Sequence, residues 1–202
     1  MSRSDVRYFD ATHTYTVGDR AIAHVTGVLK AAGVINDYWF TEIGRQRGSA
    51  VHMAAALLDQ GRLDGSSVDP RIRGYLEGYL DFKARYRPDW THVEEIVYSP
   101  TYNYAGRVDR AGYLNGTDRL WVVDLKTGAP QRWVRLQLVA YAQALREETG
   151  EHYARASLEL KADGRFTLTP YDNEPHRYRY DLAAFTGAMA LLRWLKREEN
   201  MT

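Results

Sequence analysis

Apolar residues recur along this chain with two spacings, one typical of helices and the other typical of strands. Over the first ninety residues, the pattern predicts three short strands followed by three helices. The predicted strands are residues 7–9, 14–17 and 21–25, and the predicted helices are residues 26–33, 36–60 and 69–86. Thr26, Asn36 and Asp69 are the expected helix caps, and Pro70 suits a first helical position.

From Thr91 onward, the spacing of apolar residues changes to the alternation of strands. The pattern predicts strands at residues 92–98, 105–114 and 119–125, a helix at 131–148, strands at 153–160 and 165–169, and a last helix capped by Asp181. Asn115-Gly116-Thr117-Asp118 has the composition of a turn, so the strands on either side of it should form a hairpin. This succession predicts an α/β fold with a mixed central sheet flanked by helices.

The composition supports a single folded domain. The chain has 202 residues, of which 45% are apolar and 26% charged, which is enough for a packed core and too balanced for disorder. We divide the domain into a strand pair with a short helix (residues 1–35), a helical part (36–90) and a core with the C-terminal helix (91–202). No stretch suits a membrane span or a signal peptide, so the cytoplasm is the expected location.

Charge and cysteine content exclude several classes of protein. The net charge is only +1, from 27 Lys and Arg against 26 Asp and Glu, so any site for a polyanion must be local. The sequence contains no cysteine, which excludes disulfides, cysteine-based zinc fingers and iron–sulfur clusters. The function must therefore depend on other side chains.

Three charged residues come together on the predicted hairpin. A turn centred on Gly116-Thr117 would set Asp109 opposite Asp124, with the two Cβ atoms about 4.5–5.5 Å apart. A turn centred on Asn115-Gly116 would make the two aspartates diagonal neighbours on the same face. Lys126 follows Asp124 by two residues, so it should project from that face too. Two carboxylates beside an ammonium group suit Mg²⁺ or Mn²⁺.

The opposite face of the hairpin is expected to be apolar and covered by helices, with Val108, Trp121, Val123 and Leu125. Asp-x-Lys is common by chance, and three such charges can also form a salt-bridged, solvated strand face. Other segments of the chain are needed to decide between a metal site and a solvated surface.

Four segments resemble, in order and spacing, the motifs of the PD-(D/E)XK nuclease superfamily in its RecB-like branch. They are Gly48-Ser49-Ala50-Val51-His52, Gly106-Arg107-Val108-Asp109, Val122-Val123-Asp124-Leu125-Lys126-Thr127-Gly128 and Gln137-Leu138-Val139-Ala140-Tyr141. The branch contains helicase-linked nucleases, CRISPR-adaptation nucleases and phage exonucleases. The resemblance covers residues 44–141, and residues 8–28 look like the same part of small phage exonucleases. Several relatives carry an iron–sulfur cluster held by four cysteines, which this chain cannot bind.

The resemblance implies a restriction-endonuclease-like fold and a role for each motif residue. His52, Asp109, Asp124 and the backbone carbonyl of Leu125 would bind Mg²⁺ or Mn²⁺. Lys126 would orient the attacking water or stabilise the charge on the phosphorane. Gln137 and Tyr141 would line the site or hold the substrate strand. Glu95 would be an additional acidic residue, with its neighbour Glu94 as the alternative. Without the resemblance, His52 and Tyr141 could be ordinary core residues.

The same resemblance implies a substrate and a function. The expected function is that of a metal-dependent DNA exonuclease of phage recombination or of DNA repair. Arg107, Arg132 and Arg135 are candidates for contacts with DNA phosphates, and the expected partners besides DNA are a separate recombinase, helicase or single-strand-binding protein. A structure-specific or CRISPR-adaptation-like endonuclease is one alternative, and a catalytically silent DNA-binding module is another. A phage-encoded protein would act in the host cytoplasm.

Overall fold

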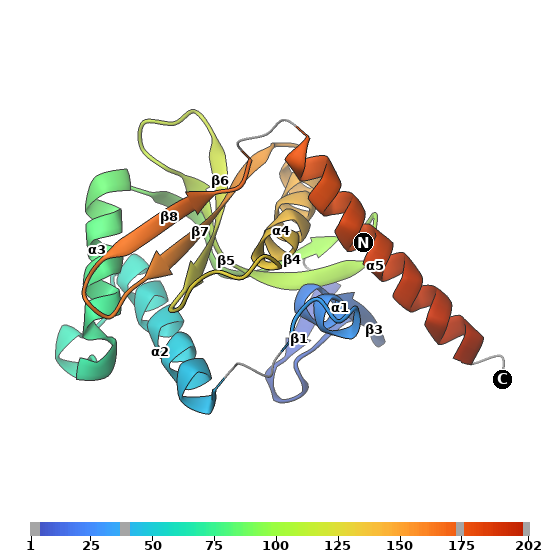
Figure 1. Ribbon diagram of the computed structural model, residues 1–202, viewed down its shortest axis with the longest axis horizontal. Helices are drawn as coiled ribbons and strands as arrows, with labels where there is room; N and C mark the ends of the chain where they lie inside the picture. The colour runs from blue at the N-terminus through green and yellow to red at the C-terminus, as the bar shows by residue number, and fades with distance from the viewer. Residues whose placement is uncertain (1–4, 37–40, 173–175, 200–202) are drawn as a thin grey trace.

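The computed structural model describes residues 5–36, 41–172 and 176–199, which form one mixed sheet with helices on both faces (Figure 1). The strands are β1 (Val6–Phe9), β2 (Thr14–Val17), β3 (Arg20–His24), β4 (Asp89–Ser99), β5 (Tyr104–Tyr113), β6 (Leu120–Lys126), β7 (Tyr153–Leu160) and β8 (Phe166–Pro170). The α-helices are α1 (Val25–Ala31), α2 (Glu42–Asp59), α3 (Arg73–Tyr86), α4 (Val134–Thr149) and α5 (Arg177–Glu199).

The strands follow the order β1-β2-β3-β5-β6-β7-β8, and β4 pairs with the other edge of β5. β3 runs parallel to β5, and β6 runs parallel to β7, whereas the remaining pairs are antiparallel. The expected α/β class with a mixed central sheet is therefore confirmed. Among the described residues, none of the helices combines the length and the apolar character that a membrane crossing requires.

Each face of the sheet has its own apolar core. Helices α1, α4 and α5 cover one face, where buried residues such as Leu138 and Phe185 surround Val122 of β6. Helices α2 and α3 cover the other face, where Val123 and Leu125 of β6 are buried. Neighbouring residues of β6 thus enter opposite cores, as the alternation of a strand buried on both faces requires.

Most helices begin near the expected residue, but two of the expected caps are wrong. Asp69 does cap its segment by accepting a hydrogen bond from the backbone N–H of Arg71, and a short 3₁₀ turn (Pro70–Ile72) precedes α3. His24, not Thr26, caps α1, because its ring nitrogen accepts from the N–H of Gly27 at 3.2 Å. Thr41 caps the described part of α2. The expected start of that helix after Asn36 falls on residues 37–40, which lie outside the described residues.

Asp181 is the other wrong cap. Helix α5 already begins at Arg177, so Asp181 lies within its first turns and is only 3% exposed. Its carboxylate accepts hydrogen bonds from Arg135 at 2.7 Å and from Arg155 at 2.9 Å. A buried carboxylate that binds two arginines stabilises the contact of α5 with α4 and β7, and it is not available to the helix N-terminus.

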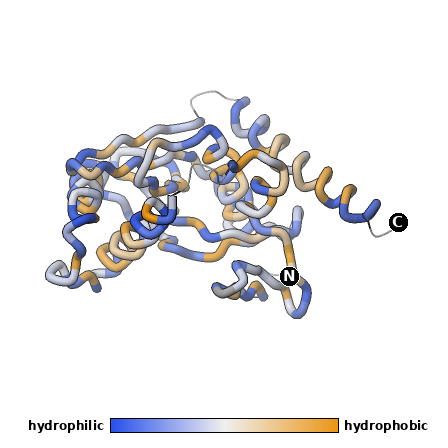
Figure 2. Tube along the Cα trace, turned by 60° about the horizontal axis from the view of Figure 1, so that its bottom comes forward, coloured by the Kyte–Doolittle hydropathy of each residue, from blue (hydrophilic) through white to orange (hydrophobic). Residues whose placement is uncertain are grey.

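The C-terminal half of α5 extends beyond the rest of the molecule (Figure 1). Polar and apolar residues alternate along this helix (Figure 2), but its buried residues end at Met189. Leu191, Trp194 and Leu195 are exposed. The amphipathic pattern therefore continues past the last turn that the core covers.

The hairpin of β5 and β6 has the register expected for a turn centred on Gly116-Thr117. The pairs run from Tyr113↔Leu120 to Arg110↔Val123. Gly116 has a φ of +80°, a left-handed conformation that favours glycine in a turn. Because the pairing stops at Arg110↔Val123, Asp109 and Asp124 are the first residues beyond the ladder.

The alternation of side chains along β5 changes phase at Asp109. Pairing with β4 continues on both sides of this point, through Val93↔Arg110 and Glu95↔Val108. Val108 is nevertheless buried in the core under α4, whereas Arg110, two residues later, contacts Tyr79 of α3 and Asp59 of α2. The prediction that Val108 shares an apolar face with Val123 and Leu125 is therefore wrong, because the strand is irregular at Asp109.

Candidate active site

The sheet is open on one edge of β5. Tyr104 and Ala105 pair with β3, and the pairing with β6 starts only at Arg110. Among the described strands, none pairs with residues 106–109 on this edge. Asp109 lies at the end of this gap, and its carboxylate accepts a hydrogen bond from the backbone N–H of Leu125 at 2.7 Å. A side chain thus replaces the backbone partner at the point where β5 and β6 separate.

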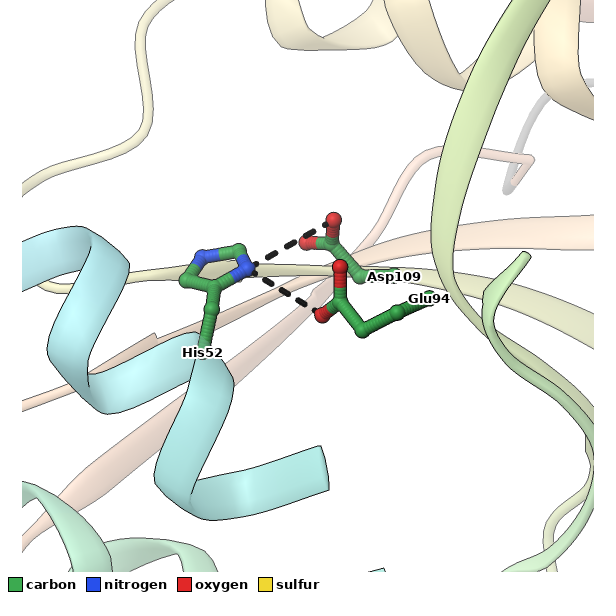
Figure 3. Close-up of side chains that lie close together, drawn as sticks. All are labelled: His52, Glu94 and Asp109. Carbon is green, nitrogen blue, oxygen red and sulfur yellow. Dashed lines mark ion pairs between the residues drawn. The ribbon is translucent and has the colours of Figure 1, made fainter. Parts of the chain in front are cut away.

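Three side chains from three elements converge at this opening (Figure 3). Nδ1 of His52, on α2, lies 3.5 Å from Oε1 of Glu94, on β4, and 3.6 Å from Oδ1 of Asp109, on β5. One ligand atom from each residue lies within 4.8 Å of the other two, a spacing that a metal ion could bridge. The other ring nitrogen of His52, Nε2, donates to the carbonyl oxygen of Leu125 at 3.0 Å.

The two carboxylates make His52 a base stronger than an ordinary histidine. Burial alone would lower its pKa, but the negative charges of Asp109 and Glu94 outweigh burial and raise the pKa to about 9. His52 is therefore protonated at neutral pH in the metal-free protein. It then neutralises part of the charge of a site that is otherwise acidic.

Asp124 and Lys126 form an ion pair beside this group. Nζ of Lys126 lies 2.5 Å from Oδ2 of Asp124, whose side chain is only 2% exposed, and 5.5 Å from the centre of the Trp133 ring. Burial raises the pKa of Asp124 to about 6, against the lowering effect of Lys126, and Asp109 raises it further. Burial alone would lower the pKa of Lys126, but Asp124 and Asp109 raise it, so the ammonium group stays charged.

This set of donors fits a divalent cation with a preference for oxygen ligands. The acidic groups are carboxylates, and Oδ2 of Asp124 is buried with the Lys126 ion pair but without a hydrogen bond. Buried carboxylates without enough compensating charge are costly, and a cation would remove that cost. The structure brings His52, Asp109 and the Leu125 carbonyl together, and Asp124 lies near enough for the charge of His52 to lower its pKa.

Glu94, rather than Glu95, is the glutamate of this cluster. Glu95 pairs with Val108, whose side chain enters the core under α4, and paired residues project to the same face of a sheet. Glu94 has a φ of +52°, which lies in the left-handed region that a glutamate rarely adopts. This local conformation turns the Glu94 side chain toward His52. The preference for Glu95 at the sequence level is therefore not supported by the geometry.

Gln137 and Tyr141 lie on one face of α4, as their spacing predicts. Nε2 of Gln137 donates to the hydroxyl of Tyr141 at 3.0 Å, and both side chains are buried. Tyr141 and Asp109 line a cavity of about 170 Å³, and a Cβ at Gly106 would lie 2.5 Å from the Tyr141 ring. Gly106 is thus required by the close approach of this ring, and the pair lies next to the open edge of β5.

The three arginines expected to contact phosphates lie in different surroundings. Arg107 lines a cavity of about 770 Å³ together with His52 and Glu94, and its guanidinium lies 4.7 Å from the centre of the Tyr8 ring. Arg132 is exposed. Arg135 binds Asp181, so its charge is already neutralised within the protein. Arg107 is therefore the one of the three that the structure places beside the cluster.

Comparison with known proteins assigns the chain to a class. Residues 67–196 match the PD-(D/E)XK nuclease superfamily, and the chain belongs to this superfamily. No curated protein sequence matches the chain. The family assignment made from the four motifs is thus confirmed.

Solved structures resemble this one across most of the chain. A proposed exonuclease from Eubacterium rectale has 13% sequence identity and a TM-score of 0.52, over 88% of this chain and 75% of that protein. An alkaline exonuclease from Laribacter hongkongensis has 13% identity and a TM-score of 0.32, over 86% and 92% of the two chains. Its complex with dAMP has 14% identity and a TM-score of 0.32, over 80% and 99%. At these identities the Eubacterium rectale structure is evidence for the fold alone, and it confirms the restriction-endonuclease-like architecture.

Proposed function

We propose that this protein is a metal-dependent DNA exonuclease that hydrolyses phosphodiester bonds in recombination or repair. The observation that carries the proposal is the convergence of His52, Glu94 and Asp109 beside the buried Asp124–Lys126 pair. The family of the chain is one of nucleases, and the exonuclease assignment follows the description of the Eubacterium rectale protein. DNA is the proposed substrate, and a recombinase, helicase or single-strand-binding protein is the proposed partner.

The residues of the site would have different roles in hydrolysis. His52, Asp109, Asp124 and the Leu125 carbonyl, with Glu94 as a further carboxylate, would hold Mg²⁺ or Mn²⁺. When bound, such an ion supplies a water of lowered pKa and neutralises phosphate charge. Lys126 keeps its proton beside Asp124, so its ammonium group would stabilise the charge that develops on the phosphate or orient the attacking water.

The surroundings of the cluster suit a nucleic-acid strand. The cavity beside His52 is lined by apolar side chains such as Met53 and Leu57 and by the stacked pair of Tyr8 and Arg107. Arg107 would contact a backbone phosphate, and the apolar wall and the Tyr8 ring offer surfaces for a base. Gln137 and Tyr141 would line the site from the side of α4.

Cleavage of linear DNA is expected only in the presence of Mg²⁺ or Mn²⁺, because the acidic groups of the site cannot activate water by themselves. The assay compares end-labelled linear DNA, single- and double-stranded, with and without EDTA. Activity that survives an excess of EDTA would contradict the metal-dependent mechanism.

Closed circular DNA is the matched control for the mode of cleavage. An exonuclease should leave circles intact while it degrades the same sequence in linear form. Equal rates on both forms would favour the endonuclease alternative. The absence of cleavage of every DNA, in protein that binds Mn²⁺, would favour the silent DNA-binding module.

His52→Ala is expected to weaken Mn²⁺ binding by about tenfold or more, as loss of a residue at a metal site does. The variant should recover part of its activity at high Mn²⁺ concentration, because only the affinity for the ion is reduced. Calorimetric titration with Mn²⁺ measures the effect. His152→Ala is the control, since His152 is exposed between α4 and β7. Equal Mn²⁺ affinity in the two variants would make His52 a structural residue.

A further inference from the structure

Arg110 is a fully buried arginine next to the candidate metal site. Its side chain is 0% exposed, although it directly follows Asp109 in β5. Nη1 donates to Oε1 of Glu94 at 3.0 Å and to the backbone carbonyl of Asp109 at 2.6 Å. A single guanidinium nitrogen thus binds to two of the residues whose carboxylates face His52.

The other side of the Arg110 guanidinium is fixed by helices α2 and α3. Nε donates to Oδ2 of Asp59 at 2.7 Å, and Asp59 is the last residue of α2. The Asp59 carboxylate also accepts from the hydroxyl of Tyr79 and from Nζ of Lys83, both at 2.6 Å. His52 lies on the same helix as Asp59, two turns earlier. Arg110 therefore connects the helix that carries His52 to the two strands that carry Glu94 and Asp109.

This connection coincides with the irregular part of the sheet. Glu94 has the left-handed φ of +52°, and the side-chain alternation of β5 changes phase at Asp109. A strained conformation of a glutamate persists only when surrounding contacts hold it. The Arg110 hydrogen bonds to Glu94 and to the Asp109 carbonyl are contacts of this kind.

We infer that Arg110 is a positioning residue of the metal site, which holds the Glu94 carboxylate and the Asp109 backbone against His52 and uses Asp59 as its anchor. The inference rests on the proposed function, because it assigns Arg110 to the cation site of the nuclease. Arg110 does not contact the cation and has no part in the chemical step. Its effect is to keep the negative groups at the spacing that the cation needs.

Two observations distinguish this role from simple stabilisation. Nη2 of Arg110 is buried and has no hydrogen-bond partner among the described residues, so the bonds of the two terminal nitrogens go to Glu94 and Asp109. Arg155 offers the comparison, because it is equally buried and ion-paired with Asp172 and Asp181, away from the cluster. Arg155 ties β7 to α5: within the described residues, its guanidinium donates to Asp172, to Asp181 and to the carbonyl of Arg135, outside the His52 cluster.

The test compares Arg110→Lys with Arg155→Lys. Lysine keeps the charge but lacks the planar fork, so it cannot reach Asp59, Glu94 and the Asp109 carbonyl together. Both variants are expected to melt lower than the wild type. Arg110→Lys alone is expected to bind Mn²⁺ about tenfold more weakly in calorimetric titration, the size of effect typical of residues that support metal ligands. If Arg110→Lys fails to fold, the double variant Asp59→Asn/Arg110→Met replaces it in the test. This variant removes both buried charges, and we expect it to weaken Mn²⁺ binding to the same extent.

A double-mutant cycle with Glu94→Gln tests whether Arg110 affects Mn²⁺ binding through the Glu94 carboxylate. If Arg110 acts through the Glu94 carboxylate, Arg110→Lys should cost much less Mn²⁺ affinity in the Glu94→Gln background than in the wild type. The inference alone would be overturned if Arg110→Lys and Arg155→Lys bound Mn²⁺ equally tightly while the wild type bound Mn²⁺ and cleaved DNA. Wild-type protein that neither binds Mn²⁺ nor cleaves DNA would overturn both the inference and the proposed function.

Discussion

Lys126→Ala is expected to slow DNA cleavage by about a hundredfold or more, the cost of removing a preorganised group that stabilises charge in a transition state. The ammonium group lies 2.5 Å from Asp124 and keeps its charge because of Asp124 and Asp109. In the proposed mechanism, this ammonium group stabilises the negative charge that develops on a phosphate held at the site. Single-turnover cleavage of linear DNA at saturating Mn²⁺ measures the loss.

Metal binding should survive the same substitution, since Lys126 is a cation and not a ligand. Removing a positive charge beside Asp124 should leave the thermal shift with Mn²⁺ no smaller than that of the wild type. Lys161→Ala is the control: Lys161 pairs with Glu159 at 3.8 Å, close to the end of β7, and its loss should leave cleavage within about twofold. A Lys126→Ala enzyme with the wild-type rate would remove this residue from the mechanism.

Asp124→Asn is expected to melt no lower than the wild type without metal and to lose most of the stabilisation by Mn²⁺. Burial raises the pKa of Asp124 from 3.8 to about 6, so its charged form opposes folding at neutral pH by on the order of 1–3 kcal/mol. Asparagine removes this cost at nearly constant shape, but it also leaves Lys126 without its carboxylate partner, so the net gain is smaller than this cost. For the wild type, a hundredfold excess of Mn²⁺ over its Kd should add about 2.7 kcal/mol. Thermal melts in EDTA and in Mn²⁺ measure both effects.

The pH dependence of stability shows whether the charged Asp124 carboxylate stabilises or destabilises the metal-free protein. A carboxyl group whose pKa is raised by folding destabilises the protein above about pH 6, and this cost disappears as the pH falls below about 4. In EDTA, the melting temperature of Asp124→Asn relative to that of the wild type should therefore be higher at pH 7 than near pH 4. Asp181→Asn is the control, because it breaks the buried pairs with Arg135 and Arg155 outside the site. It should melt lower than the wild type and keep the full Mn²⁺ shift, and the same behaviour in Asp124→Asn would contradict the metal role.

The local patterns in the sequence predicted most of the elements and limited the hairpin to two registers. Alternation of apolar residues located β6 and β7 closely, and of the two registers left open for β5 and β6, the structure has the one centred on Gly116-Thr117. These features depend on neighbours in the chain, so a sequence shows them directly. The family motifs added His52, which no local pattern would have connected with Asp109.

The parts that could not be predicted depend on partners far apart in the chain. Glu94 enters the site because of a left-handed residue in the middle of β4, and nothing in its sequence signals such a conformation. The pairing of Arg110 with Asp59 joins residues 51 positions apart. Asp181 has the composition of a helix cap, but its tertiary contacts with Arg135 and Arg155 determine its role. Local sequence propensity therefore predicts poorly the role of a buried charged residue whose partners lie far away in the sequence.

The attachment of the first three strands bears on how a substrate reaches the cluster. β3 joins β5 through only two residue pairs, Ala23↔Tyr104 and His24↔Ala105, supported by a small apolar cluster around Tyr15 and Tyr98. Such a joint is expected to open at a lower free energy than the central strands, so the backbone amides of β1 to β3 should exchange faster than those of β6 and β7. Tyr8 of this unit lines the cavity beside His52. The cavity wall that Tyr8 forms therefore belongs to strands that are joined to the rest of the sheet through its shortest described pairing, and hydrogen exchange that is equally slow in β3 and β6 would show that this wall is fixed.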